Sequence, residues 1–245
     1  HVGAPKTGSS ALQAYFFQNR HLLEAEGLAY ELADEVEGQD GQFLNIMGNG
    51  LSLREAALSM VSPDQMKNCI NQYFGKYRKC LISTELFYDV PVESFKLIKK
   101  CCTDLGIDVI VIVFVRNISS LVLSSYHQVI KNHTYSSNLI SYIDTLKESP
   151  HVSYLKRLGS VFSNEEMHVL HYETDQNSLD RAILKILGID ASKFDRSALQ
   201  AVVNRSLHQF EVDMLLKANS LLSRIGDRDV EQRLSTALSV HLRSQ

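Results

Sequence analysis

The chain has 245 residues, of which 44% are hydrophobic and 22% charged, the balance of a soluble globular protein that can bury a sizeable core. Its 25 Lys and Arg against 28 Asp and Glu give a formal net charge of -3, which excludes a general nucleic-acid binder and a polybasic membrane binder. A net charge of -3 is still compatible with a small local anion-binding site.

Helical and strand patterns alternate along the chain. The first helix is expected from Ser9 to Glu26, where apolar residues share one face and Gly27 follows as a C-terminal glycine. In chain order, the next elements are a strand at Cys80–Ser83, a helix at Pro91–Leu105, a strand at Val109–Val115, a strand at Met167–Tyr172, a helix at Leu179–Leu187, and two amphipathic helices at Leu207–Ile225 and Val230–Leu242. This order predicts an α/β fold, a parallel β-sheet with helices on both faces. The apolar run Val109–Val115 does not alternate, which is typical of a central strand covered on both faces.

We expect a single domain over residues 1–245, because no linker or repeat interrupts the sequence. The segments 31–62 and 131–153 fit the alternation poorly and are expected to be insertions over the ligand cleft. Cysteines occur at positions 69, 80, 101 and 102, without zinc-site spacing and too few for a disulfide scaffold. They favour a reducing compartment, hence a cytoplasmic protein. The sequence begins with His1 and not with Met, so it leaves open whether a leader or an anchor precedes it.

The first ten residues, HVGAPKTGSS, lead from the tail of a predicted strand into a helix. Free N–H groups of such a loop converge on bound oxygens, which makes the loop an anion cradle. Against the P-loop pattern GxxxxGK[ST], Gly3, Gly8 and Ser10 keep their places. Ser9 stands where the lysine belongs, and the loop carries Lys6 instead.

A second departure from the P-loop pattern follows the central strand. Nucleotide triphosphatases usually end a buried strand with an Asp that holds Mg²⁺, whereas here the run Val109–Val115 is followed by Arg116. Lys6 and Arg116 would neutralise the ligand by themselves, which suits a nucleotide with a monophosphate and a singly charged leaving group better than a triphosphate. The alternative is that the loop is only a glycine-rich turn and that Arg116 is an unrelated surface residue.

These residues resemble a known family. The stretch from His1 to Gln13 resembles the 5′-phosphosulfate loop of sulfotransferases that use 3′-phosphoadenosine 5′-phosphosulfate (PAPS), in particular the bacterial carbohydrate-type branch. The stretch from Val113 to Tyr126 resembles the family's 3′-phosphate motif, with Ile118 in place of the usual Pro. His171–Glu173 and Val203–Leu207 are weaker similarities, the second to a late segment that closes over the nucleotide. The resemblance implies a P-loop-like fold, PAPS as co-substrate, 3′,5′-ADP as product, and no metal.

The resemblance also implies roles for individual residues. Lys6 would reach the 5′-phosphate and the bridging oxygen; the 5′-phosphate would also be bound by Thr7, Gly8, Ser9 and Ser10, the 3′-phosphate by Arg116 and Ser124, with Asn204 and Arg205 contributing from the late segment. For Ser124 the alternative is a hydroxyl bonded to its own helix, and for Asn204 and Arg205 it is helix capping.

An acceptor hydroxyl needs a base, and Glu85 is the favoured candidate. It follows the predicted strand Cys80–Ser83, and the carboxyl ends of strands are where α/β sheets bind ligands. The alternative is an N-cap or an ion pair. His127 and His133 are rival bases, and Lys131 either assists the transfer or is a solvated surface residue.

The function expected is sulfuryl transfer from PAPS to a hydroxyl of a carbohydrate or glycolipid, by in-line displacement. Acceptor specificity is expected in 31–62 and 131–153, and the acidic residues Asp34, Glu35, Glu37 and Asp40 favour a neutral or cationic acceptor. We expect a small-molecule or glycan partner and no nucleic acid, see no membrane segment in this chain, and leave the oligomeric state open. The alternatives are a P-loop small-molecule kinase that binds ATP with Mg²⁺, and a non-catalytic nucleotide-binding relative.

Overall fold

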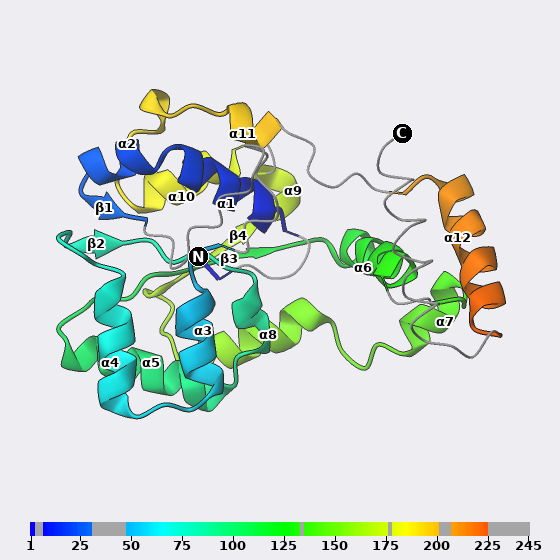
Figure 1. The fold of residues 1–245 in the computed structure, drawn as a ribbon, viewed down its shortest axis with the longest axis horizontal. Coiled ribbons are helices and arrows are strands. Elements are labelled where there is room, and N and C mark those ends of the chain that lie inside the picture. The colour runs from blue at the N-terminus through cyan, green and yellow to red at the C-terminus, as the bar shows by residue number, and fades with distance from the viewer. Residues whose placement is uncertain (3–6, 31–47, 133–134, 176–177, 201–206, 225–245) are drawn as a thin grey trace. The chain divides into compact units, whose positions relative to one another are not determined.

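The computed structural model describes residues 1–2, 7–30, 48–132, 135–175, 178–200 and 207–224. Helices and strands alternate along them (Figure 1). In chain order they are α1 (Ser9–Gln18), α2 (Arg20–Ala25), β1 (Leu28–Ala29), α3 (Leu51–Leu58), α4 (Pro63–Gln72), β2 (Lys79–Cys80), the 3-10 helix η1 (Leu86–Asp89), α5 (Val92–Asp104), β3 (Val111–Val115), α6 (Ile118–Asn132), α7 (Leu139–Asp144), α8 (Pro150–Gly159), β4 (Met167–His171), α9 (Tyr172–Asp175), α10 (Leu179–Ile186), the 3-10 helix η2 (Ala191–Lys193), α11 (Ser197–Gln200) and α12 (Gln209–Leu222).

The chain divides into two compact units. The first unit comprises His1–Arg116 and Pro150–Ala201, and the second comprises Asn117–Ser149 and Val202–Gln245. The chain therefore leaves the first unit directly after β3 and returns to it at α8. That both units belong to one domain stays a prediction of the sequence.

The strands of the first unit are parallel and are linked through the first two residues of the chain. β1 pairs with β2, and β3 pairs with β4 along their whole lengths. Val2 forms a parallel bridge with Thr84, beyond the end of β2, and its N–H donates to the carbonyl of Ile112 in β3 at 3.0 Å. The order across the sheet is thus β1, β2, the segment at Val2, β3 and β4.

β3 is covered on both faces, as its unbroken apolar sequence predicts. Val111 and Val113 belong to a core that includes residues of α3, α4, α5 and α8. Ile112 and Phe114 belong to a second core with residues of α1 and α10. Figure 1 shows these helix groups on opposite sides of the strands. The predicted α/β class, a parallel sheet flanked by helices on both faces, is confirmed.

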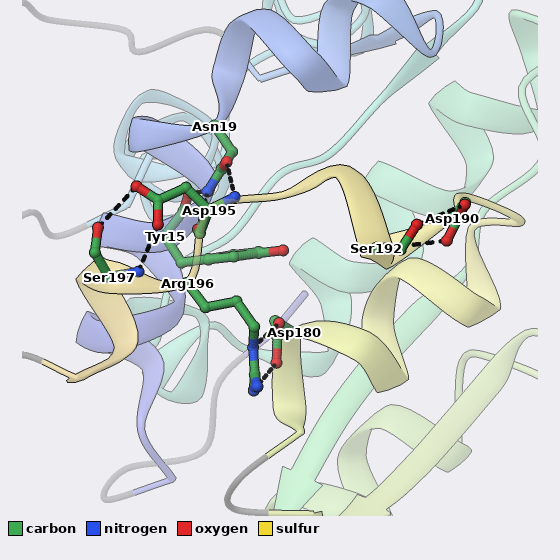
Figure 2. A network of polar contacts seen from close by, with 8 residues as sticks. All are labelled: Tyr15, Asn19, Asp180, Asp190, Ser192, Asp195, Arg196 and Ser197. Carbon is green, nitrogen blue, oxygen red and sulfur yellow. Dashed lines mark hydrogen bonds and ion pairs between the residues drawn. The ribbon is translucent and has the colours of Figure 1, made fainter.

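The first predicted helix is divided in two at Asn19. Its side chain donates to the carbonyl of Tyr15 at 2.9 Å and to the carbonyl of Asp195 at 2.8 Å, and it accepts from the N–H of Asp195 at 2.9 Å (Figure 2). These bonds tie the end of α1 to the segment before α11. Asp195 is distant in sequence, so the periodicity of residues 9–26 predicts one continuous helix and gives no sign that α1 ends at this point.

Several predicted elements differ in extent. The strand expected at Cys80–Ser83 is β2 at Lys79–Cys80, and the helix expected at Leu207–Ile225 is α12 at Gln209–Leu222. The expected insertion 31–62 contains α3, and Leu53 and Ala57 of this helix are buried in the core. Residues 31–47 and the helix expected at Val230–Leu242 lie outside the described residues.

The second unit has a small core of its own. Tyr126 and Ile130 of α6 pack with Val212 and Leu215 of α12. The buried side chain of Asn219 donates to two main-chain carbonyls, those of Ile130 and Tyr135, each at 3.0 Å. α6, α7 and α12 are therefore held together by apolar packing and by a buried amide.

Candidate active site

The sequence predicts that the N-terminus of α1 binds an anion. Gly8 is its N-cap residue with φ 77°, and no side chain caps the helix. A helix N-terminus presents unpaired N–H groups and a partial positive charge to an anion. Thr7 and Ser9, on either side of Gly8, are buried, whereas Ser10 is half-buried.

Within the first five residues of α1, two polar side chains are buried and have an atom without a hydrogen-bond partner among the described residues. They are Ser9, 2% exposed, through its Oγ, and Gln13, 1% exposed, through its Nε2. A buried hydroxyl without a partner costs free energy unless a ligand or water satisfies it. The hydroxyl of Ser9, at the first residue of an uncapped helix, is therefore suited to an anionic oxygen.

Tyr172 brings the end of the loop and the end of β3 together. β3 and β4 are in register with Val115 opposite His171, so Arg116 and Tyr172 both emerge at the carboxyl edge of the sheet. The guanidinium carbon of Arg116 lies 5.1 Å from the centre of the Tyr172 ring. On Gly8, a Cβ would lie 3.0 Å from Cε2 of the same ring. One aromatic ring thus contacts both Gly8, the N-cap residue of α1, and Arg116 at the end of β3.

Arg116 is oriented by its neighbours. Its Nε lies 3.3 Å from Oε1 of Glu173, and its main-chain N–H donates to Nδ1 of His151 at 3.1 Å. Nδ1 of His171 lies 3.6 Å from the other oxygen of Glu173. A guanidinium presents a planar fork of donors, so a carboxylate that holds Nε fixes the plane in which the remaining donors lie.

Glu85 lies at the same edge of the sheet. It directly follows Thr84, which pairs with Val2, so it is next to the strand from which the loop leaves. Glu85 is half-buried and precedes η1, yet its side chain makes no capping hydrogen bond. Glu85 is the N-cap residue of η1, which is one of the two alternatives for it, although its side chain does not cap the helix; within the described part of the chain its carboxylate forms no ion pair.

The other expected site residues fall into two groups. Lys6, His133, Asn204 and Arg205 lie outside the described residues. Ser124, His127 and Lys131 lie on α6 in the second unit, whereas Arg116 and Glu85 belong to the first. Only two residues separate β3 from α6, and the Oδ1 of Asn117 accepts from the N–H of Ser119 at 2.9 Å at the start of α6.

Sequence reasoning missed the surroundings of these residues. It gave no role to His151, whose Nδ1 accepts from the main-chain N–H of Arg116, or to the triplet Gly48–Gly50, which lies against Ser83 and Thr84 just before Glu85. In the sequence, Gly48-Asn49-Gly50 is typical of a turn. Its packing against the strand end before Glu85 is seen only in the structure.

The described residues contain no group of three or more His, Cys, Asp or Glu that could hold a metal ion. No helix within the described ranges is long and apolar enough to cross a membrane.

Comparison with known proteins gives few matches. No protein-family model and no curated protein matches the sequence. Among solved structures, the chain is similar to the crystal structure of a sulfotransferase from Alicyclobacillus acidocaldarius, with 12% identity, 96% of this chain and 94% of that chain covered, and a TM-score of 0.48.

Proposed function

We propose that this chain is a PAPS-dependent sulfotransferase, which moves the sulfuryl group of PAPS to a hydroxyl of a carbohydrate or glycolipid acceptor. The observation that carries the proposal is the uncapped N-terminus of α1, where the buried Ser9 hydroxyl lacks a partner among the described residues and Gly8 contacts the ring of Tyr172. Arg116 lies over the same ring. A helix terminus and an arginine beside one ring suit a nucleotide with two separate phosphates.

In this proposal the loop binds the 5′ side of the nucleotide and the strand end binds the 3′ side. Thr7, Gly8, Ser9 and Ser10 bind the 5′-phosphate through N–H and hydroxyl groups, Lys6 binds the bridging oxygen, Arg116 and Ser124 bind the 3′-phosphate, and Asn204 and Arg205 contribute from the late segment. The charges of Lys6 and Arg116 neutralise the nucleotide, so no metal is required.

The transfer is an in-line displacement, and Glu85 is its base. The Glu85 carboxylate accepts the proton of the acceptor hydroxyl while the hydroxyl oxygen bonds to sulfur. The bond between sulfur and the oxygen of the 5′-phosphate breaks, and Lys6 neutralises the charge that forms on that oxygen. The products are a sulfate ester and 3′,5′-ADP. His127 and His133 are the rival bases, with Lys131 as a helper.

The acceptor is assigned by chemistry alone. The segments 31–62 and 131–153 would form its side of the site, and the four acidic residues within 34–40 would favour a neutral or cationic glycan over a polyanionic one.

The proposal is tested by calorimetry with 3′,5′-ADP and 5′-AMP, which differ in the 3′-phosphate. Wild-type protein is expected to prefer 3′,5′-ADP, and Arg116→Gln to reduce that preference about 10-fold or more, because hydrogen bonds to charged groups contribute about 1.5 to 3 kcal/mol. Arg78→Gln is the control, since Arg78 is exposed just before β2, at the opposite edge of the sheet.

Absence of 3′,5′-ADP binding would overturn the proposal, and tight binding of ATP with Mg²⁺ instead would favour a kinase. Transfer from PAPS to a panel of glycans, with Lys6→Ala as the inactive variant, tests catalysis. Nucleotide binding without transfer to any acceptor would indicate a non-catalytic relative.

A further inference from the structure

The triplet Gly48-Asn49-Gly50 lies against the strand end that leads to Glu85. The main-chain N–H of Asn49 donates to the carbonyl of Ser83 at 3.1 Å. Its side chain accepts from the N–H of Ser83 at 2.7 Å and donates to the carbonyl of Leu81 at 2.8 Å. Asn49 is 1% exposed, and all three bonds are therefore buried.

Asn49 takes the place of a neighbouring strand. β1 ends at Ala29, whose carbonyl accepts from the N–H of Leu81 at 2.9 Å. Without Asn49, the main-chain groups of Leu81 and Ser83 on this side would have no partner among the described residues, and unpaired main-chain groups in a protein interior are costly. One asparagine, through its main chain and its amide, supplies the missing hydrogen bonds.

The two glycines permit this close approach. A Cβ on Gly48 would lie 1.8 Å from the carbonyl oxygen of Ser83, and Gly48 also has φ 78°. A Cβ on Gly50 would lie 2.6 Å from Cγ2 of Thr84. A side chain at either position would displace the strand end at the residues just before Glu85.

The opposite side of the same strand end is also held. The N–H of Thr84 donates to the carbonyl of His1 at 3.2 Å, and its Oγ1 accepts from the N–H of Leu86 at 3.2 Å. The main chain that enters and leaves Glu85 is thus fixed, while no described residue pairs with the Glu85 carboxylate. The position of this carboxylate depends on the backbone that carries it.

We propose that Gly48-Asn49-Gly50, here called the Asn49 clamp, is a positioning element that holds Glu85 at the acceptor hydroxyl. The proposal rests on the proposed function, in which Glu85 is the base. Asn49 acts through Glu85 and touches no substrate. Loss of the clamp should impair transfer to the acceptor and leave the nucleotide site, formed by other segments, intact.

A double-mutant cycle tests the dependence on Glu85. Asn49→Ala is expected to lower kcat about 10- to 100-fold with Glu85 present, the effect of a misplaced catalytic group, and to have little effect when Glu85 is already replaced by Gln. Affinity for 3′,5′-ADP should change less than about 3-fold. An equal loss of kcat in both backgrounds would overturn the proposal.

Asn19→Ala is the matched control. Asn19 is also a buried asparagine that donates to main-chain carbonyls and accepts from a main-chain N–H, but it holds Asp195. Its effect on kcat should be the same in the wild-type background and in the Glu85→Gln background, because it does not act through the base.

Hydrogen exchange tests the clamp without any acceptor. Amides of residues 81–86 should exchange faster in Asn49→Ala, and amides of 194–197 faster in Asn19→Ala. If Asn49→Ala does not fold, Gly50→Ala is compared with Gly159→Ala, whose Cβ would meet nothing within 4 Å. Unchanged exchange at 81–86 would overturn the clamp, whereas wild-type protein that fails to bind 3′,5′-ADP would overturn only the proposed function.

Discussion

The ring of Tyr172 closes directly against Gly8, so that a Cβ on this glycine would lie 3.0 Å from Cε2 of the tyrosine. Gly8 also has φ 77°, a conformation that side chains disfavour. The N-terminus of α1 is thus fixed by a backbone conformation and by a contact with α9, the element that follows β4.

Gly8→Ala is expected to lower both stability and affinity for 3′,5′-ADP. The left-handed backbone alone costs about 1 to 2 kcal/mol with a side chain, and the contact with Tyr172 adds to it. Gly188→Ala separates the two effects, because Gly188 has φ 72° but its Cβ would meet nothing within 4 Å. Thermal unfolding and calorimetry measure both quantities. Equal losses of stability and an unchanged affinity in the two variants would show that the contact is unimportant.

Arg196→Ala should destabilise the first unit strongly. Arg196 forms two hydrogen bonds, of 2.9 and 3.0 Å, with the fully buried carboxylate of Asp180 (Figure 2). Removing one partner of a buried pair leaves the other charge uncompensated, and because Arg196 is 33% exposed we expect a loss of about 2 to 4 kcal/mol in chemical denaturation. Lys193→Ala, which removes an exposed pair with Glu26, is the control and should have a much smaller effect. Similar losses would contradict the prediction.

His127 should titrate below pH 6.5. Partial burial and then the charge of Lys131 lower the pKa of this histidine. The unfolded chain then binds the proton more readily than the folded one, so this group reduces stability as the pH falls through 6.5. NMR titration of the imidazole measures the shift, and Lys131→Met should raise the pKa towards 6.5. A pKa that does not move in this variant would exclude Lys131 as a cause.

Cys80 and Cys102 should react slowly with iodoacetamide in the folded protein. Burial raises the pKa of Cys80 to about 12 and that of Cys102 to about 11, and the thiolate is the reactive form. At pH 8 both should be modified many times more slowly than in denaturant, as mass spectrometry of peptides would show. Rapid modification of the folded chain at either residue would contradict the burial that the structure gives them.

The sequence predicted the parts of the site that depend on local pattern. The helix that starts at Ser9, the central strand that precedes Arg116 and the strand end before Glu85 are each marked by a short run of residues with a clear period or composition. Arg116 and Tyr172 meet because parallel strands in register end at one edge, which the order of the elements already implies.

The remaining features depend on contacts between distant residues. Asp195 stabilises the break between α1 and α2 at Asn19, and Asn49 holds the strand end before Glu85. Neither hydrogen bond can be predicted from the periodicity of the sequence. Helix α3 was expected within an insertion because its eight residues give a weak pattern, and its burial comes from α4 and α5. Long-range pairing of this kind overrides local propensity.

The bond between Asn19 and Asp195 has a consequence for synthesis of the chain. The two residues are 176 positions apart, so a nascent chain on the ribosome carries α1 long before its partner has been made. Contacts of such sequence separation form late and slow folding. A chain truncated before Asp195 would keep the glycine-containing loop but lose the bonds that end the following helix, and is expected to be a target for chaperones or proteases during translation.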